Sequence, residues 1–188
     1  MACNLLFDWI APLYDQVASP RPVDVLLDKL KLPSTGRLFE AGGGTGRIAI
    51  GLCPYIDFLA LGDLSFSMLR QANTKAHLHV LQHKAERLPF AEDTFDRILV
   101  VDALHHFSDQ ETAIGELLRV LKRGGRLVIE EPNIEKFAVK LIAWGEKLAL
   151  MGSKIHTAEK IQAIFLQWGY PSQVCKENFA VWVTVDKE

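Results

Sequence analysis

Apolar residues recur along this chain with two different periods that alternate. Short runs that are apolar at nearly every position predict strands covered on both faces, whereas spacings of three and four predict helices with one buried side. The expected strands are residues 37–41, 57–62, 78–81, 95–101, 126–131, 172–176 and 179–185. The expected helices are residues 23–32, 45–52, 65–76, 136–151 and 157–168, with one further helix between Ser108 and Gly124. This alternation predicts a parallel sheet with helices on both faces.

Capping residues mark two of these helices. Ser65 is expected to cap the helix over 65–76, because a serine side chain can accept from the free backbone N–H groups of a first turn. Ser108 and Glu111 form the spacing of a capping box, and Gly124 is the expected stop of the same helix.

Length and composition indicate one globular domain over residues 1–188. Of the 188 residues 49% are hydrophobic and 23% are charged, which suits a domain with a sizeable core. A net charge of −2 argues against a nucleic-acid surface. The three scattered cysteines are expected to be reduced thiols, and neither a secretion signal nor a membrane-spanning run is expected, so we predict a cytoplasmic location.

The stretch "LFEAGGGTG", residues 38–46, places a glycine-rich turn between an expected strand and an expected helix. A phosphate-binding P-loop would need a Gly-Lys pair, which occurs nowhere in the chain. Asp63 follows Gly44 by nineteen residues and ends the second expected strand, where a carboxylate can hold both hydroxyls of a ribose. These features indicate a ligand with an adenosine-like ribose and leave NAD and S-adenosylmethionine as alternatives.

Other motifs separate these two cofactors. None of the three tyrosines has a lysine four residues further on, as the short-chain oxidoreductase pair would require. The stretches "LFEAGGGTG", "LGDLSFSMLRQA", "AERLPFAEDTFDRILVVDALHHF" and "ELLRVLKRGGRLVIEEPN" resemble, in this order, the motifs of class I S-adenosylmethionine-dependent methyltransferases. The N-terminal "FDWIAPLYD" resembles the ubiquinone/menaquinone-biosynthesis C-methyltransferase-like branch, the type 11 methyltransferases.

The resemblance implies a fold, a cofactor and a set of site residues. The fold would be an α/β, Rossmann-like, doubly wound sheet of seven strands, mostly parallel with an antiparallel last strand. The cofactor would be S-adenosyl-L-methionine, with S-adenosylhomocysteine as the product. The implied cofactor-binding residues are Tyr14, Glu40, Ala41, Gly42, Gly44, Asp63, Leu64, Ala85, Glu86, Asp102 and Ala103. Two positions depart from the family pattern: Lys84 stands where a small acidic residue usually contacts the adenine, and Gly43 replaces a common cysteine.

Histidines are the candidates for further chemistry. His105 is the predicted catalytic base, with His106 and Asp102 nearby in the motif, whereas packing of the "LHHF" turn is the alternative reading. His77 and His79 share one face of an expected edge strand with His83. The span from His79 to His83 is too long for one ion, so we expect a solvated face and no metal site.

Two segments are expected to meet the acceptor: an N-terminal lid, residues 1–20, and a helical segment, residues 134–155. In the second, an apolar stripe is flanked by lysines over 136–154, which indicates a lipid-like acceptor or peripheral contact with a membrane. An ordinary packed helix is the alternative. The sequence therefore predicts methyl transfer to a small or lipid-like acceptor, with quinone-type carbon methylation favoured, in a monomer or homodimer. Methylation of a polar metabolite at oxygen or nitrogen, or a non-catalytic cofactor-binding subunit, remain open.

Overall fold

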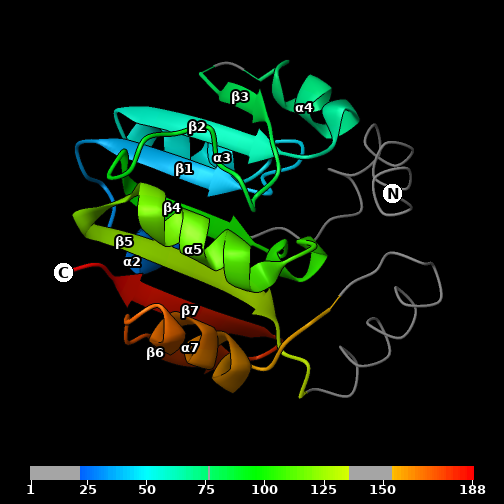
Figure 1. The fold of residues 1–188 in the computed structure, drawn as a ribbon. Coiled ribbons are helices and arrows are strands. Elements are labelled where there is room, and N and C mark those ends of the chain that lie inside the picture. Colours follow the sequence, from blue (N-terminus) through cyan, green and yellow to red (C-terminus); the bar gives the residue numbers. More distant parts are fainter. Residues whose placement is uncertain (1–21, 76, 136–153) are drawn as a thin grey trace.

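The structure, a computed structural model, describes residues 22–75, 77–135 and 154–188. Its centre is a seven-stranded sheet (Figure 1). The strands are β1 (Arg37–Ala41), β2 (Phe58–Asp63), β3 (His79–Gln82), β4 (Phe95–Val101), β5 (Leu121–Pro132), β6 (Gln173–Glu177) and β7 (Ala180–Asp186). Each strand overlaps a predicted one, and β5 begins five residues earlier than the expected start at Arg126. The predicted lid, residues 1–20, and most of the predicted segment 134–155 lie outside the described residues.

Helices cover both faces of the sheet. The helices are α2 (Val23–Leu30), α3 (Ala49–Leu52), α4 (Phe66–Ala72), α5 (Gln110–Val120) and α7 (Ala158–Gln167), with short 3-10 turns η1 (Cys53–Tyr55) and η2 (Leu104–His106). In Figure 1, α5 and α7 lie in front of the sheet and α2 and α3 lie behind it. Two apolar clusters follow the same division: Phe39, Ile98 and Ile129 pack towards α5 and α7, whereas Leu38 and Leu99 pack towards α2 and α3.

The strand order is β3-β2-β1-β4-β5-β7-β6, and the chain reverses its direction of travel across the sheet between β1 and β4. The first five strands in this order are parallel, and β7 lies antiparallel to both β5 and β6. This confirms the predicted doubly wound sheet with an antiparallel last strand. In such sheets the carboxyl ends of the strands beside the reversal form a crevice, which here lies beyond β1 and β4.

The observed caps confirm one prediction and correct another. Ser65 caps α4, because its hydroxyl accepts from the Met68 N–H at 3.2 Å. The capping box at Ser108 is wrong: Asp109 caps α5, with its two carboxylate oxygens on the Thr112 N–H at 3.0 Å and the Thr112 hydroxyl at 2.7 Å. The predicted stop at Gly124 is also wrong, because Leu121 is extended and the chain passes from α5 directly into β5.

In the part of the chain that the structure describes, we find no helix with the length and apolar character needed to cross a bilayer. The described cysteines, Cys53 and Cys175, are free thiols.

Candidate cofactor-binding site

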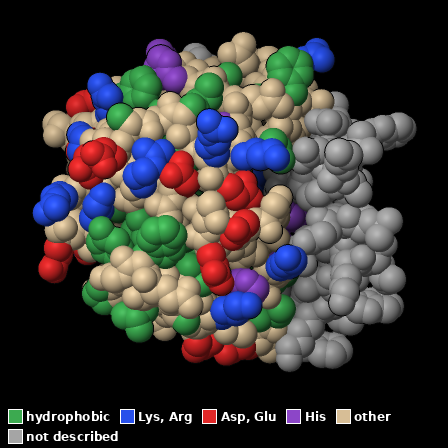
Figure 2. All heavy atoms as spheres, viewed as in Figure 1, with side chains coloured by type: hydrophobic (Ala, Val, Ile, Leu, Met, Phe, Trp, Pro, Cys, Tyr) green, Lys and Arg blue, Asp and Glu red, His purple; other side chains and the backbone are tan. Residues whose placement is uncertain are grey.

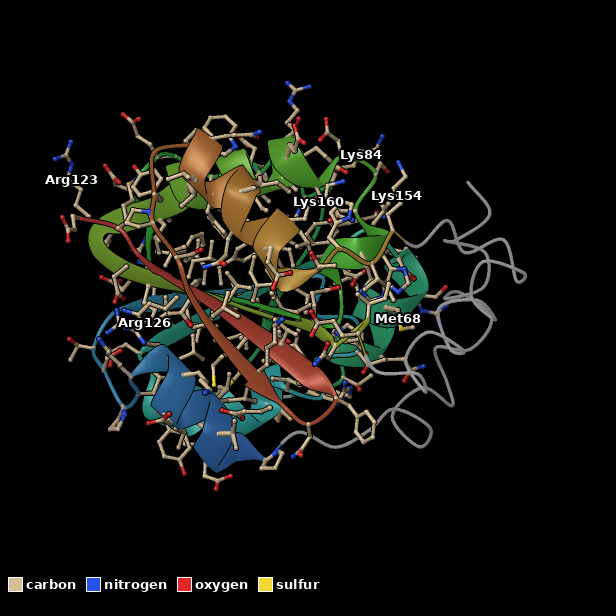
Figure 3. All side chains as sticks on the ribbon, turned by 90° about the horizontal axis from the view of Figure 1, so that it is seen from below. Met68, Lys84, Arg123, Arg126, Lys154 and Lys160 are labelled. Carbon is tan, nitrogen blue, oxygen red and sulfur yellow. The ribbon has the colours of Figure 1, made fainter. Side chains whose placement is uncertain are left out.

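A pocket of about 420 Å³ lies beyond the carboxyl ends of β1, β2 and β4. Its volume falls in the range of sites for drug-sized ligands. It is lined by Gly42, Gly44, Gly62, Asp63, Leu64, Ser65, Met68, His83, Lys84, Ala85, Glu86, Asp102, Ala103, His106, Phe107 and Ser108. Eight of the eleven predicted cofactor-binding residues are in this set. In Figure 3, Met68 and Lys84 mark the pocket side of the molecule, and Arg123 and Arg126 lie at the other end.

The glycine turn forms one wall of the pocket. Gly42, Gly44 and Gly46 have φ values of +71°, +54° and +73°, a left-handed conformation that side chains disfavour. A β-carbon on Gly42 would lie 2.5 Å from the β-carbon of Ala103, whereas the space beside Gly44 is open. Bare backbone at Gly44 therefore permits a ligand to approach closely. The turn also explains why α3 begins at Ala49 and not at the predicted Thr45.

Asp63 ends β2 and faces this turn. Its Oδ2 accepts from the Gly44 N–H at 2.9 Å and its Oδ1 accepts from the Ser65 N–H at 2.8 Å. These two bonds fix the carboxylate at the pocket wall, and each oxygen keeps a further acceptor site. Burial raises the pKa of Asp63, and the two N–H donors oppose that shift. Next to it, Leu64 is 39% exposed and offers an apolar surface at the same wall.

Lys84, Ala85 and Glu86, which follow β3, line another wall of the pocket. The Glu86 Oε1 accepts from the Asp109 N–H at 3.0 Å, which ties this wall to the start of α5. Lys84, the departure from the family pattern, is exposed and lines the pocket. Figure 2, which has the same view as Figure 1, shows acidic and basic side chains interspersed over the described part of the visible face.

The turn after β4 carries the remaining predicted residues. Asp102 has a φ of +53° and donates its N–H to the Glu130 carbonyl at 2.9 Å. Glu131 then holds the following turn η2, because its Oε1 accepts from the Leu104 N–H at 2.9 Å and its Oε2 lies 2.7 Å from the His105 Nδ1. Within η2, His106 is among the residues that line the pocket.

His105, the predicted base, is buried away from the pocket that His106 lines. His105 and Glu131 are each 2% exposed, and His105 is not among the residues that line the pocket. The rings of His105 and His106 are tilted by 50° to one another, with centroids 4.0 Å apart. Burial, together with the charge of His105, lowers the pKa of His106 to about 3. A catalytic role for His105 stays a prediction, and η2 presents His106 to the pocket in its place.

Glu40 and Ala41 are also absent from the pocket lining. Glu40 is 2% exposed and Ala41 is fully buried at the end of β1. The Glu40 Oε2 has no hydrogen-bond partner within the described residues. Burial raises the pKa of Glu40 to about 8, although Arg47 and the Ala49 N–H oppose that shift. The roles of Glu40 and Ala41 in cofactor binding stay predictions. Tyr14 lies outside the described residues.

His83 is one of the pocket-lining residues that the sequence pattern missed. It lines the pocket, and its ring lies 5.5 Å from that of Phe39, so the predicted solvated face is wrong for this residue. His77 and His79 are exposed as expected. The position of His83 directly after β3 could have indicated this role. The neighbouring strand ends there at Asp63, whose carbonyl accepts the His83 backbone N–H at 3.1 Å. Over the described ranges, no three His, Cys, Asp or Glu side chains are grouped to hold a metal ion.

These features fit an adenosine-type cofactor. The Asp63 carboxylate suits a pair of ribose hydroxyls, the open backbone at Gly44 permits close approach, and the buried Glu40 leaves an acceptor unsatisfied behind the turn. The fold and this site together define the class I methyltransferase architecture.

Comparison with known proteins shows similarity to methyltransferases. Residues 39–129 match the family model described as "Methyltransferase domain". The chain is 34% identical over 113 residues to the uncharacterized methyltransferase YcgJ of Bacillus subtilis, covering 54% of this chain and 45% of the relative. It is 33% identical over 143 residues to the ubiquinone/menaquinone biosynthesis C-methyltransferase UbiE of Syntrophotalea carbinolica, covering 67% of this chain and 59% of the relative. The chain thus spans about half the length of the curated relatives it matches.

Solved structures show the same fold. A possible histamine N-methyltransferase from Thermotoga maritima superposes with a TM-score of 0.78 at 24% identity, covering 98% of this chain and 99% of that one. The YcgJ structure superposes with a TM-score of 0.75 at 18% identity, covering 88% and 98%. In sequence the chain is thus similar to methyltransferases, and it shares the fold of S-adenosylmethionine-dependent ones.

Proposed function

We propose that the protein transfers a methyl group from S-adenosylmethionine to a small or lipid-like acceptor. The observation that carries this proposal is the pairing of Asp63 with the Gly44 backbone at the end of two adjacent strands. This arrangement supplies a carboxylate for ribose hydroxyls beside backbone that a ligand can approach. The family match over residues 39–129 supports the same cofactor.

The sulfonium of the bound cofactor supplies an activated methyl group, so the protein mainly has to hold the acceptor in line with it. Such positioning can lower a barrier by about 7–11 kcal/mol. Asp102 and Ala103 approach the methyl end of the cofactor by family resemblance, and His106 shares their wall. An acceptor oxygen, nitrogen or carbon must also lose a proton. We assign the removal of this proton to the pocket wall that contains Asp102 and His106.

The acceptor class is supported by sequence. The lysine-flanked apolar stripe over 136–154 suits a lipid-like acceptor, and one relative is named as a ubiquinone/menaquinone biosynthesis C-methyltransferase. We therefore favour carbon methylation of a quinone-type molecule, with methylation of a polar metabolite as the alternative. A flotation assay with anionic vesicles at low salt tests the surface role of residues 136–154, and no lipid association would exclude it.

Titration calorimetry tests cofactor binding. The parent protein is expected to bind S-adenosylmethionine and S-adenosylhomocysteine but not NADH, and Asp63→Ala is expected to lose most of this affinity. Asp28→Ala, on α2, is the matched control and is expected to bind as the parent does. Binding of NADH alone, or unchanged binding by Asp63→Ala, would contradict the proposal.

Turnover separates an enzyme from a binding subunit. Formation of S-adenosylhomocysteine is measured with a short-chain quinol, a phenol, an amine and a carboxylic acid as acceptors. Turnover with the quinol or phenol is expected. Cofactor binding without turnover on any acceptor would favour the non-catalytic alternative, and turnover with the amine alone would favour a polar metabolite.

A further inference from the structure

The carboxyl group of Glu40 lies beneath the glycine turn without contributing to the pocket wall. Glu40 pairs with Leu61 of β2 on one side and Leu99 of β4 on the other, so its backbone is fixed in the middle of the sheet. A β-carbon on Gly43 would lie 3.1 Å from the Glu40 Cδ, which places the carboxyl group directly behind the turn. Its Oε2 has no hydrogen-bond partner in the described part of the chain.

Charged and titratable groups face this carboxyl group from several elements. Arg47 follows the glycine turn, Lys75 follows α4, Asp63 ends β2 and Cys53 begins η1. The Lys75 ammonium donates to the Thr45 carbonyl at 2.7 Å, so it also holds the turn. Burial is the largest influence on the Glu40 pKa and outweighs the two cations, which leaves the carboxyl group largely protonated near neutral pH.

A protonated carboxyl group in this position responds to the charge of the ligand. A positive charge in the pocket favours the carboxylate, whereas a neutral ligand leaves the proton in place. The cofactor carries a sulfonium cation, and the product left after methyl transfer is a neutral thioether. The two ligands differ in charge at one atom and are otherwise alike in shape.

We propose that Glu40 is a specificity determinant that distinguishes the cationic cofactor from its neutral product by losing a proton when the cofactor binds. This inference rests on the proposed function. The Glu40 O–H bond breaks as the cofactor binds, and its proton passes to solvent. After methyl transfer has removed the sulfonium charge, the Glu40 carboxylate takes a proton back from solvent. By linkage, the affinity for the cofactor relative to the product increases as the pH rises.

Calorimetry in two buffers of different ionisation enthalpy counts the protons. At pH 7.5, binding of S-adenosylmethionine is expected to release up to about 0.8 proton more from the parent than from Glu40→Gln, because a group with a pKa of about 8 is about three-quarters protonated there. With S-adenosylhomocysteine, the parent and Glu40→Gln are expected to release the same number of protons. The amino groups of the ligands contribute equally to parent and variant, so they cancel. Glu111→Gln, which removes a carboxylate from exposed α5 surface, is expected to match the parent.

The outcomes separate this inference from the proposed function. If the parent binds neither ligand, the proposed function fails. If it binds both and the proton count is the same in parent and Glu40→Gln, only the role of Glu40 fails. Should Glu40→Gln not fold, infrared difference spectra of the parent decide. Loss of a protonated carboxyl band on adding S-adenosylmethionine but not S-adenosylhomocysteine supports the inference, and its persistence with both ligands overturns it.

Discussion

The imidazole ring of His83 occupies the space into which a side chain on Gly62 would project. The nearest ring atom to that position is Nε2, and the carbons on either side of it are next. The same ring packs against Phe39 and Phe90, with centroids 5.5 and 6.4 Å away. The absence of a β-carbon at Gly62 therefore allows one side chain to reach from the end of β3 across β2 and form part of the pocket.

Gly62→Ala is expected to displace this ring and to destabilise the fold by about 1–3 kcal/mol, the usual cost of overpacking a filled site. His83→Ala alone is expected to destabilise the fold less than Gly62→Ala does. The double variant is expected to regain part of the stability that Gly62→Ala loses, because the two side chains no longer compete for the same space. Urea unfolding of all four proteins gives the coupling energy. Additive effects would show that the two residues do not compete for this space.

The stability of the protein is expected to fall as the pH rises towards 8. Because the pKa of Glu40 is raised from 4.5 to about 8 on folding, the native state binds more protons than the unfolded state between these values. The stabilisation is complete below pH 4.5 and is lost as the pH rises through 8, at up to about 1.4 kcal/mol per pH unit.

Thermal unfolding from pH 6 to 9 measures this dependence. Glu40→Gln is expected to show a shallower decline and to be more stable than the parent at pH 9, because a neutral amide replaces a carboxylate that burial disfavours. The raised pKa of Asp63 gives a decline of the same sign at pH values above its ordinary pKa, and the variant keeps this contribution. Identical slopes in both proteins would contradict this account of Glu40.

The sequence was sufficient for the features that depend on backbone pattern. Apolar runs located all seven strands, and the glycine turn after β1 located the pocket with Asp63 at its wall. Both depend on chain order, because a parallel sheet brings the carboxyl ends of its strands to one edge.

Side-chain direction in short turns could not be predicted in the same way. In η2, His105 is buried against Glu131 whereas the adjacent His106 lines the pocket, and no periodicity distinguishes the two. The start of α5 shows the same limit, because adjacent Ser108 and Asp109 are both suitable caps. The hydrogen bonds from Thr112 to Asp109 decide between them, and only the folded backbone reveals these.

Glu131→Ala is expected to destabilise the protein by about 1–3 kcal/mol, because it removes the carboxylate that lies 2.7 Å from the buried His105 Nδ1, and that ring nitrogen loses its hydrogen bond to Glu131. It also removes the acceptor of the Leu104 N–H, so η2 loses its two hydrogen bonds to the Glu131 carboxylate. Glu131→Gln is expected to cost less, since the amide oxygen can still accept from Leu104. Urea unfolding gives the stabilities.

Calorimetry with S-adenosylhomocysteine is expected to show weaker binding for both Glu131 variants, because the pocket residue Ala103 directly precedes η2. Equal stability of the two variants would mean that the Leu104 link contributes nothing.

A second network holds the pocket wall formed by Lys84, Ala85 and Glu86 from outside the pocket. Arg119 donates to the carbonyls of Phe90 and Leu88 at 2.8 and 3.1 Å, and Glu116 accepts from the Leu88 N–H at 2.8 Å. These bonds fix the loop that begins with Lys84, although neither side chain lines the pocket.

Arg119→Lys is expected to weaken S-adenosylhomocysteine binding roughly 5-fold, since an ammonium cannot bridge two carbonyls and a carboxylate together, and a lost hydrogen bond is worth about 1 kcal/mol. The charge is unchanged, so the loss reports the geometry of the loop. Arg123→Lys is the matched control, because Arg123 lies at the other end of the molecule from Lys84 (Figure 3). Calorimetry on both variants measures the difference. Equal affinities would show that the loop keeps its position without the arginine bridge, and the wall at Ala85 would then depend on Glu86 and its bond to α5.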